Sequence, residues 1–167
     1  FEAFYQQSQV RECVRDDFLV LTFDGKGIVM RPDGLREQTR RKAAAAKGKL
    51  KTRLSAGEKR DRKRMAMVAA VYDQPARVRT AEDVICTHPE QVSYRPPPAR
   101  IQNKRVWASV EREPAAVIEE AFIEALKRDP EHRRRWVILI DGQQHQLKLI
   151  HKALNRLQIE ATIIMDF

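Results

Sequence analysis

Two short apolar runs, each followed by Asp-Gly, constrain the fold of this chain more than any other feature. They read FLVLTFDG at 18–25 and WVILIDG at 136–142. A run this apolar is typical of a strand that is buried on both faces, as in a parallel sheet covered by helices. The sequence therefore predicts two buried strands that end at carboxylates, Asp24 and Asp141.

Each carboxylate allows two interpretations. Asp-Gly opens tight turns, because glycine adopts positive φ readily, and Asp141 is also well placed to cap a helix. Alternatively, the two strands are neighbours, and Asp24 and Asp141 then face one another across about 4.8 Å. Two charges that close repel unless a divalent cation lies between them, and Mg²⁺ or Mn²⁺ prefers such oxygen ligands. The second interpretation predicts a metal site for phosphoryl transfer.

The middle of the chain predicts a hairpin. Residues 65–72 read as a buried strand, and the Asp-Gln-Pro sequence at 73–75 turns it into a second extended piece at 77–80. Residues 80–113 show little regular patterning, so we expect connecting segments there.

The last part of the chain predicts alternating helices and strands. An amphipathic helix begins at Glu113-Pro114 and ends at Asp129-Pro130. After the WVILI strand, apolar residues spaced by three and four predict a second helix over 147–157, and 159–165 returns as a strand. This is a βαβ unit, so its two strands are expected to be parallel.

The excess positive charge lies in one segment. The chain has a net charge of +9, and residues 31–64 hold 14 of its 32 Lys and Arg but only 4 of its 23 Asp and Glu. Strong helix formers predict a basic helix at 36–47, and the capping-box pattern Ser55-x-x-Glu58 predicts a short second one. A charge run is most often a solvated face, but this concentration also favours a polyanion such as nucleic acid.

Length and composition favour one soluble, intracellular domain. The chain has 167 residues, and no apolar run approaches the roughly 20 residues that span a bilayer. Cys13 and Cys86 are far apart and lie in no zinc-binding pattern. Because the chain starts without Met and stops after an apolar run, we expect a fragment. Residues 1–17 would be the tail of a preceding helical region, and 18–167 one core truncated at its C-terminus.

Three sequence blocks resemble the DDE transposases of bacterial insertion sequences, in particular the ISKra group. The blocks are LTFDGKGIVMRPDGLREQTRRKA, KLKTRLSAGEKRDRKRMAMVAAVYD and RWVILIDGQQHQLKLI, and the similarity spans 18–167. The resemblance implies a ribonuclease-H-like α/β fold, a mixed sheet of three antiparallel strands followed by αβαβ, with a basic helical insertion at about 31–64. It also implies Mg²⁺- or Mn²⁺-dependent cleavage and joining of DNA strands during transposition of an insertion sequence.

By this resemblance Asp24 is the first catalytic acid and metal ligand, and Asp141 is the second. The third acid of such enzymes lies on a helix after the fifth strand, so we expect it beyond the end of this chain and expect the fragment to be inactive. Asp166 also ends an apolar strand and is interpreted as auxiliary. Glu119 or Glu120 would supply a ligand only by analogy with ribonucleases of this fold, and a solvated helix face is the favoured interpretation.

The resemblance implies DNA, both transposon ends and target, as the partner, further copies of the full-length protein, and no membrane. It implies a bacterial cytoplasmic location at the nucleoid. Lys26 and His145 are weaker candidates for phosphate or water contacts. The predicted DNA-binding residues are Arg36, Arg40, Arg41, Lys42, Lys47, Lys49, Lys51, Arg53, Lys59, Arg60, Arg62, Lys63 and Arg64.

Two other functions remain open from the sequence. One is a non-catalytic nucleic-acid-binding module derived from a decayed element, in which Asp24 and Asp141 are turn residues. The other is a ribonuclease-H-like nuclease that hydrolyses strands without joining them.

Overall fold

The structure of the chain is a computed structural model that describes residues 17–45, 54–60, 62–81, 85 and 99–166. The helical tail expected at the N-terminus lies outside these residues. The elements are β1 (Phe18–Val29), the 3-10 helix η1 (Pro32–Gly34), α2 (Glu37–Ala45), α3 (Ala56–Arg60), β2 (Lys63–Gln74), β3 (Gln102–Ser109), α5 (Pro114–Arg128), β4 (Trp136–Ile140), α6 (Gln144–Leu157) and β5 (Ala161–Met165).

The strands form one mixed sheet in the order β3-β2-β1-β4-β5. β1 pairs antiparallel with β2, and β2 with β3, whereas β4 runs parallel to both β1 and β5. The prediction that the two Asp-Gly runs belong to neighbouring strands is therefore confirmed, as is the parallel pairing of the last two strands. The chain has an α/β fold with a mixed sheet.

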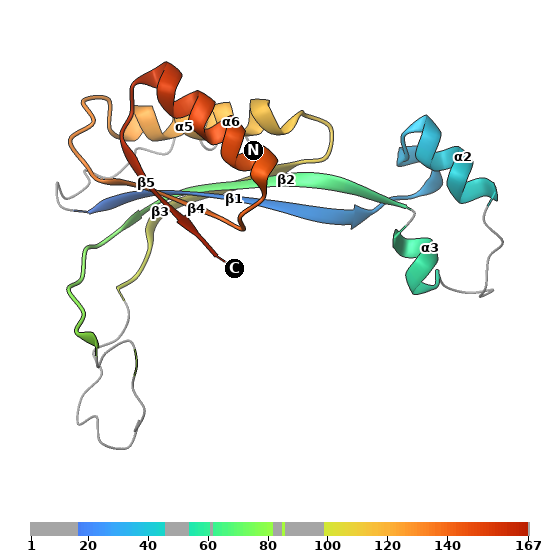
Figure 1. Ribbon diagram of the computed structural model, residues 1–167, viewed down its shortest axis with the longest axis horizontal. Coiled ribbons are helices and arrows are strands. Elements are labelled where there is room, and N and C mark those ends of the chain that lie inside the picture. The colour runs from blue at the N-terminus through green and yellow to red at the C-terminus, as the bar shows by residue number, and fades with distance from the viewer. Residues whose placement is uncertain (1–16, 46–53, 61, 82–84, 86–98, 167) are drawn as a thin grey trace.

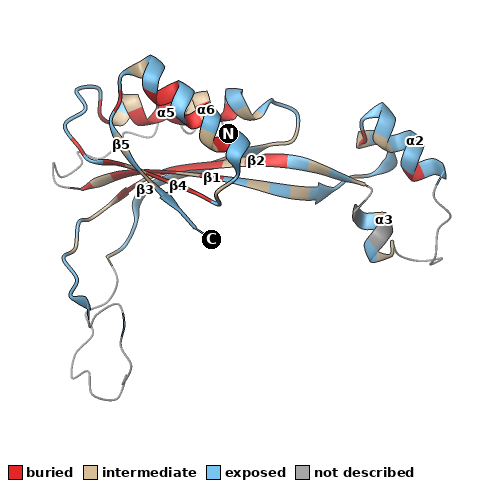
Figure 2. Ribbon diagram, in the orientation of Figure 1, coloured by how far each residue is buried: buried red, intermediate tan, exposed pale blue. Residues whose placement is uncertain are grey.

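The core lies between one face of the sheet and helices α5 and α6, which pack side by side on it (Figure 1). Alternate residues of β1 from Leu19 to Phe23 and of β4 from Trp136 to Ile140 point into this core. Phe122 of α5 stacks between Phe23 and Trp136, with ring centroids 6.5 and 6.4 Å away. Figure 2 shows that burial concentrates here. Among the described residues, no helix covers the opposite face of the sheet.

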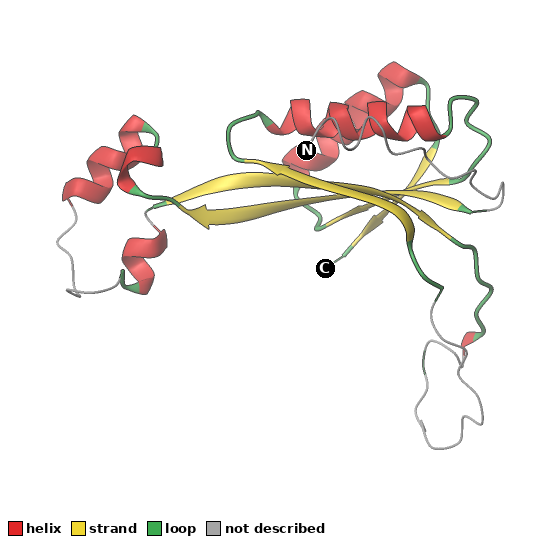
Figure 3. Ribbon diagram, turned by 180° about the vertical axis from the view of Figure 1, so that it is seen from behind, coloured by secondary structure: helices red, strands yellow, loops and turns green. Residues whose placement is uncertain are grey.

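The far ends of β1 and β2 form a projecting two-stranded segment. β1 pairs with β4 only as far as Phe23, and β2 pairs with β3 only from Met67 onward. Within the described part of the chain, residues 26–29 and 63–66 therefore pair only with each other. We call this segment, with η1, α2 and α3 at its end, the arm (Figures 1 and 3).

The expectation that the first strand ends at Phe23 is wrong. Asp24 and Gly25 stay in β1, because β2 continues to offer hydrogen-bonding partners beyond them: Asp24 pairs with Val68 and Gly25 with Met67. No turn forms at this Asp-Gly.

The predicted hairpin between residues 65–72 and 77–80 is also wrong. The strand that follows β2 is β3, and residues 75–80 belong to no strand. No sequence pattern predicts β3, because much of its inward side is polar. Arg105 of β3 forms an ion pair with Glu124 of α5, at 2.5 Å between Nη1 and Oε2. A strand with a charged residue at a core-facing position lacks the apolar alternation that identifies strands in sequence.

Asp73, expected in a turn, is a buried residue of β2. Its carboxylate accepts hydrogen bonds from Nη2 of Arg134 (2.8 Å) and from Nδ2 of Asn103 (2.6 Å). Arg134 also donates to the backbone carbonyls of Asp17 and Phe18, both at 3.1 Å. The buried ion pair thus joins the start of β1, the end of β2 and the segment before β4.

Two more buried carboxylates stabilise α5 and its end. Burial alone would raise the pKa of Glu124, but hydrogen bonds and charge from Arg128 and Arg105 outweigh it and hold that pKa below its ordinary value. Asp129 follows the helix end as predicted. Burial opposes its charge too, yet the indole N–H of Trp136 and two backbone N–H groups hold the pKa of Asp129 below its ordinary value.

We expect acid to destabilise the protein through these two groups. A carboxyl whose folded-state pKa lies below its unfolded value stabilises fully above the unfolded pKa, about 4, and loses that contribution as the pH falls through the folded pKa. In urea unfolding, the free energy of unfolding should therefore fall less between neutral pH and about pH 3 for Glu124→Gln than for the wild type. The exposed control Glu160→Gln should behave as wild type. Equal acid sensitivity of wild type and Glu124→Gln would contradict this assignment.

Candidate active site at the carboxyl ends of the parallel strands

Asp24, Asp141 and Asp166 occupy equivalent register positions on three adjacent strands. Phe23 pairs with Ile140, and Ile140 pairs with the residue before Asp166, so each aspartate comes one position after a paired residue. The backbone N–H of Asp166 donates to the carbonyl of Ile140 (2.9 Å), which continues the β4–β5 ladder to this point. All three aspartates are exposed. They form a row along the carboxyl edge of the parallel strands.

The row lies on the face of the sheet that no described helix covers. Successive residues of a strand point to opposite faces, and Phe23 and Ile140 point into the core. The positions of Asp24 and Asp141 therefore belong to the other face. One strand spacing, about 4.8 Å, separates the two backbones. This is the arrangement that the sequence predicted for the pair.

The two Asp-Gly sequences nevertheless have different local structures. Gly142 has a φ of 78°, so the chain turns there, and the carboxylate of Asp141 accepts a hydrogen bond from the backbone N–H of Gln143 (3.2 Å). Asp141 is thus a turn residue. It is not the N-cap of α6, because that position belongs to Gln143. β4 must leave the sheet here to reach α6, whereas β1 continues into the arm.

The side chains that could bind a metal ion at this edge are two carboxylates, and carboxylates suit a hard cation. Mg²⁺ is commonly held by one or two carboxylates, with water and phosphate oxygens completing its shell. Asp24 and Asp141 fit that requirement. Across the described ranges, no group of three or more His, Cys, Asp or Glu side chains could hold a metal ion. Asp166 lies two strand spacings from Asp24, roughly 10 Å, which is too far for both to bind one ion.

The two glutamates considered as further ligands are engaged elsewhere. Glu119 forms an ion pair with Arg156 of α6, and Glu120 accepts a hydrogen bond from Arg112 at 2.7 Å. These contacts support the interpretation of an ionic, solvated helix face for both.

The predicted DNA-binding residues that the structure describes all belong to the arm. Arg36 precedes α2, which carries Arg40, Arg41 and Lys42; Lys59 and Arg60 belong to α3; Arg62 precedes β2, and Lys63 and Arg64 are its first two residues. Lys47, Lys49, Lys51 and Arg53 lie outside the described residues. The arm leaves the sheet at the carboxyl end of β1, which is also the edge that carries the aspartates. Basic and acidic residues therefore occur at the same end of the molecule.

Local contacts order the helices of the arm. The predicted capping box forms, since the backbone N–H of Ser55 donates to Glu58 (2.9 Å) and that of Glu58 donates to the Ser55 hydroxyl (3.4 Å). Glu37 accepts hydrogen bonds from Arg41 and Arg40, and these lower the pKa of its carboxyl. Part of the positive charge on α2 is therefore balanced within the helix.

One polar residue near this edge was not singled out from the sequence. Gln146, in the first turns of α6, is 2% exposed. Its position offers a signal, because it lies four residues before Ile150 and so extends the apolar stripe of α6 by one helical turn. A polar residue on a buried stripe indicates either an internal hydrogen bond or a ligand contact.

Comparison with models of protein families, with curated proteins and with solved structures finds no match to this chain. Of the helices that the structure describes, none has the length and apolar character needed to cross a bilayer.

Proposed function

We propose that this chain is the catalytic core of a DDE-type transposase, which cleaves and joins DNA strands by metal-dependent phosphoryl transfer. The observation that carries the proposal is the matched position of Asp24 and Asp141 on adjacent parallel strands. The order of elements supports it, because three antiparallel strands followed by αβαβ is the arrangement expected of a ribonuclease-H-like domain.

The residues of the site have distinct parts in this chemistry. Asp24 and Asp141 would hold Mg²⁺ by their carboxylate oxygens. When bound, the ion would activate a water or a 3′-hydroxyl and stabilise the charge that develops on the phosphate. Lys26 is exposed and lies on the same face of β1 as Asp24, two residues on, where its ammonium can attract a neighbouring DNA phosphate. The exposed face leaves room for a DNA backbone.

The arm has the charge and the position to guide DNA to this site. Its basic side chains would contact phosphates irrespective of sequence, since such contacts position a duplex but do not read bases. Because the arm starts where the aspartates lie, a duplex held along it reaches the carboxylates at its base.

A strand-cleavage assay tests this proposal. The full product of the gene should nick supercoiled DNA in Mg²⁺ and not in EDTA, and should join a 3′-hydroxyl oligonucleotide to plasmid DNA. Residues 1–167 alone should bind DNA without cutting it. Cleavage without joining would favour the nuclease. Binding without cleavage by the full product would favour the non-catalytic module.

We expect the arm to determine the salt dependence of DNA binding. Each phosphate contact with duplex DNA contributes about 0.9 to the slope of log affinity against log salt. Replacing Arg40, Arg41 and Lys42 with Ala should lower the slope by about 1 to 3, with the smaller value if Glu37 already neutralises the two arginines. Fluorescence anisotropy across a salt series measures this slope.

The control for this prediction removes the same charge elsewhere. Lys127, Lys148 and Lys152 are exposed on α5 and α6, away from the arm. Their replacement with Ala should leave the slope close to that of the wild type. If both triple variants lower the slope equally, binding follows net charge, and the arm has no special part in it.

A further inference from the structure

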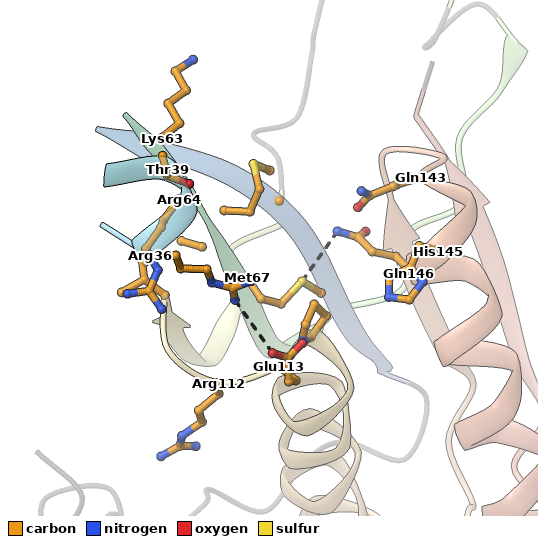
Figure 4. Close-up of a pocket in the computed structure, with 15 residues that line it drawn as sticks. Arg36, Thr39, Lys63, Arg64, Met67, Arg112, Glu113, Gln143, His145 and Gln146 are labelled. Carbon is orange, nitrogen blue, oxygen red and sulfur yellow. Dashed lines mark hydrogen bonds and ion pairs between the residues drawn. The ribbon is translucent and has the colours of Figure 1, made fainter. Parts of the chain in front are cut away.

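A pocket of about 400 Å³ lies beside the candidate active site, on the helix-covered side of the sheet. This volume is within the range of sites that hold small organic ligands. Gly25, which follows Asp24 directly, lines it together with the first turn of α6, the start of α5, and Arg36 and Thr39 of the arm (Figure 4). Because neighbouring strand residues face opposite ways, Asp24 and this pocket lie on the two sides of β1 at the same level.

The floor of the pocket contains a buried amide with an unsatisfied oxygen. Gln146 extends from α6 towards Met67, whose sulfur lies 3.6 Å from its Nε2 (Figure 4). Its Oε1 is buried and has no hydrogen-bond partner in the described part of the chain, and the same is true of Nε of Arg64. Most buried polar atoms in folded proteins are paired, so an unpaired one calls for a ligand or another specific explanation.

The pocket walls combine apolar surface with positive charge. Met65, Met67 and Pro114 provide apolar surface, while Lys63 and Arg64 provide charge. The guanidinium of Arg112 also lines the pocket but is paired with Glu120 at 2.7 Å. Glu113 is the single acid among the described lining residues, and it pairs with Arg36 at 3.9 Å. The N-terminus of α6, whose N-cap makes no side-chain cap bond, adds backbone N–H groups at the rim. The lining thus offers an apolar surface, a buried amide oxygen without a described partner and a cationic mouth.

From this combination we propose that the pocket holds a single unpaired nucleotide of the bound DNA. An exocyclic amino group of the base donates to Oε1 of Gln146, the ring packs on the methionines Met65 and Met67, and the phosphate lies against the guanidinium group of Arg64. Methionine sulfur makes favourable contacts with aromatic rings. A bare phosphate would not pair with an amide oxygen, and a purely apolar ligand would leave the cationic mouth unused.

The shape of the sheet explains how one strand reaches both sites. Beyond Phe23, β1 pairs with no described strand on the side of β4. A DNA strand that passes round this edge places one phosphate at Asp24 and Asp141 and the next nucleotide in the pocket. This inference rests on the proposed function, since it takes DNA as the ligand.

Binding measurements in EDTA test the inference without any cleavage chemistry. The 167-residue chain is titrated against duplexes with one bulged adenine, cytosine, thymine or abasic site. Adenine and cytosine carry the required amino group, so their duplexes should bind roughly 5- to 100-fold more tightly than the thymine and abasic duplexes. In Gln146→Leu this difference should disappear, while affinity for the abasic duplex stays at the wild-type level.

Variants separate ligand binding from folding. Because Oε1 of Gln146 has no described partner, Gln146→Leu should melt at or above the wild-type temperature, and Gln146→Met provides a second apolar replacement of similar length. Gln144→Leu is the matched control, since Gln144 is exposed in the same turn and does not line the pocket. It should keep the base preference.

Each other outcome counts against the inference. Equal affinity for all four duplexes, or a preference for thymine, would overturn the nucleotide pocket and leave the DNA-binding proposal intact. Failure to bind any duplex would overturn the proposed function and the pocket with it. Calorimetry with dAMP distinguishes a free nucleotide from DNA: we expect dAMP to bind more weakly than the bulged adenine duplex, and tighter binding of dAMP would reassign the pocket to free nucleotides.

Discussion

Asp24→Asn and Asp141→Asn should each lower Mg²⁺-dependent DNA cleavage by the full gene product by about 100-fold or more. Asparagine keeps the size of the side chain but removes the charge that holds the ion. The two carboxylates are exposed at matched positions of adjacent strands, so each substitution removes one of the two proposed ligands. DNA affinity should change less than about twofold, because the arm provides most of the charge that binds phosphate. Nicking rates and anisotropy on the same preparations measure both quantities.

Metal binding by residues 1–167 provides an independent readout of the same pair. Mn²⁺ should broaden NMR signals near Asp24 and Asp141 at low occupancy, and either Asn substitution should remove that broadening. Asp166→Asn is the informative control, since Asp166 lies in the same row but one strand further. It should retain most of the effect. If Asp166→Asn removes the broadening and Asp24→Asn does not, the ion binds between β4 and β5 and the proposed pair is wrong.

The parts of this fold that sequence predicts well are those with a local pattern. The runs that became the central part of β1 and all of β4 are continuous and apolar, because helices and neighbouring strands bury them. The stripe of α5 places Phe122 in the core as its spacing indicates. Since the two central strands are parallel neighbours, recognising them also located Asp24 and Asp141 at one edge.

The parts that sequence does not predict depend on residues far apart in the chain. β1 continues past Asp24 because β2 pairs with it there, and nothing in the Asp-Gly sequence itself shows that partner. Arg105 of β3 can face the core because it pairs with Glu124 of α5. In the sequence alone, an arginine at such a position looks like a surface residue. The pocket at Gln146 needs α5, α6 and the arm together. These features depend on tertiary contacts, which the local periodicity of apolar residues in the sequence does not reveal.

Removing one partner of the buried Arg134–Asp73 ion pair should give the largest loss of stability in the molecule. The side chains are 4% and 1% exposed, so Asp73→Ala leaves a guanidinium buried without its counter-charge. Such a change costs about 3 to 5 kcal/mol, a large part of the 5 to 15 kcal/mol that stabilises a typical domain. We expect Asp73→Ala to shift the urea midpoint strongly downward, and Arg134→Met to do the same, because the carboxyl group of Asp73 is then buried without the guanidinium that pairs with it.

Two comparisons distinguish the buried charge from a general effect of mutation. The double variant Asp73→Ala with Arg134→Met removes both charges, and it should be more stable than either single variant, since an apolar pair avoids the cost of an unpaired ion. Glu131→Ala removes an ion pair with Arg133 whose side chains are 61% and 59% exposed, and it should cost less than about 1 kcal/mol. If the stability lost in the double variant equals the sum of the losses in the two single variants, the ion pair does not couple these residues. The stability would then come from the separate hydrogen bonds that Arg134 donates to the start of β1 and that Asn103 donates to Asp73.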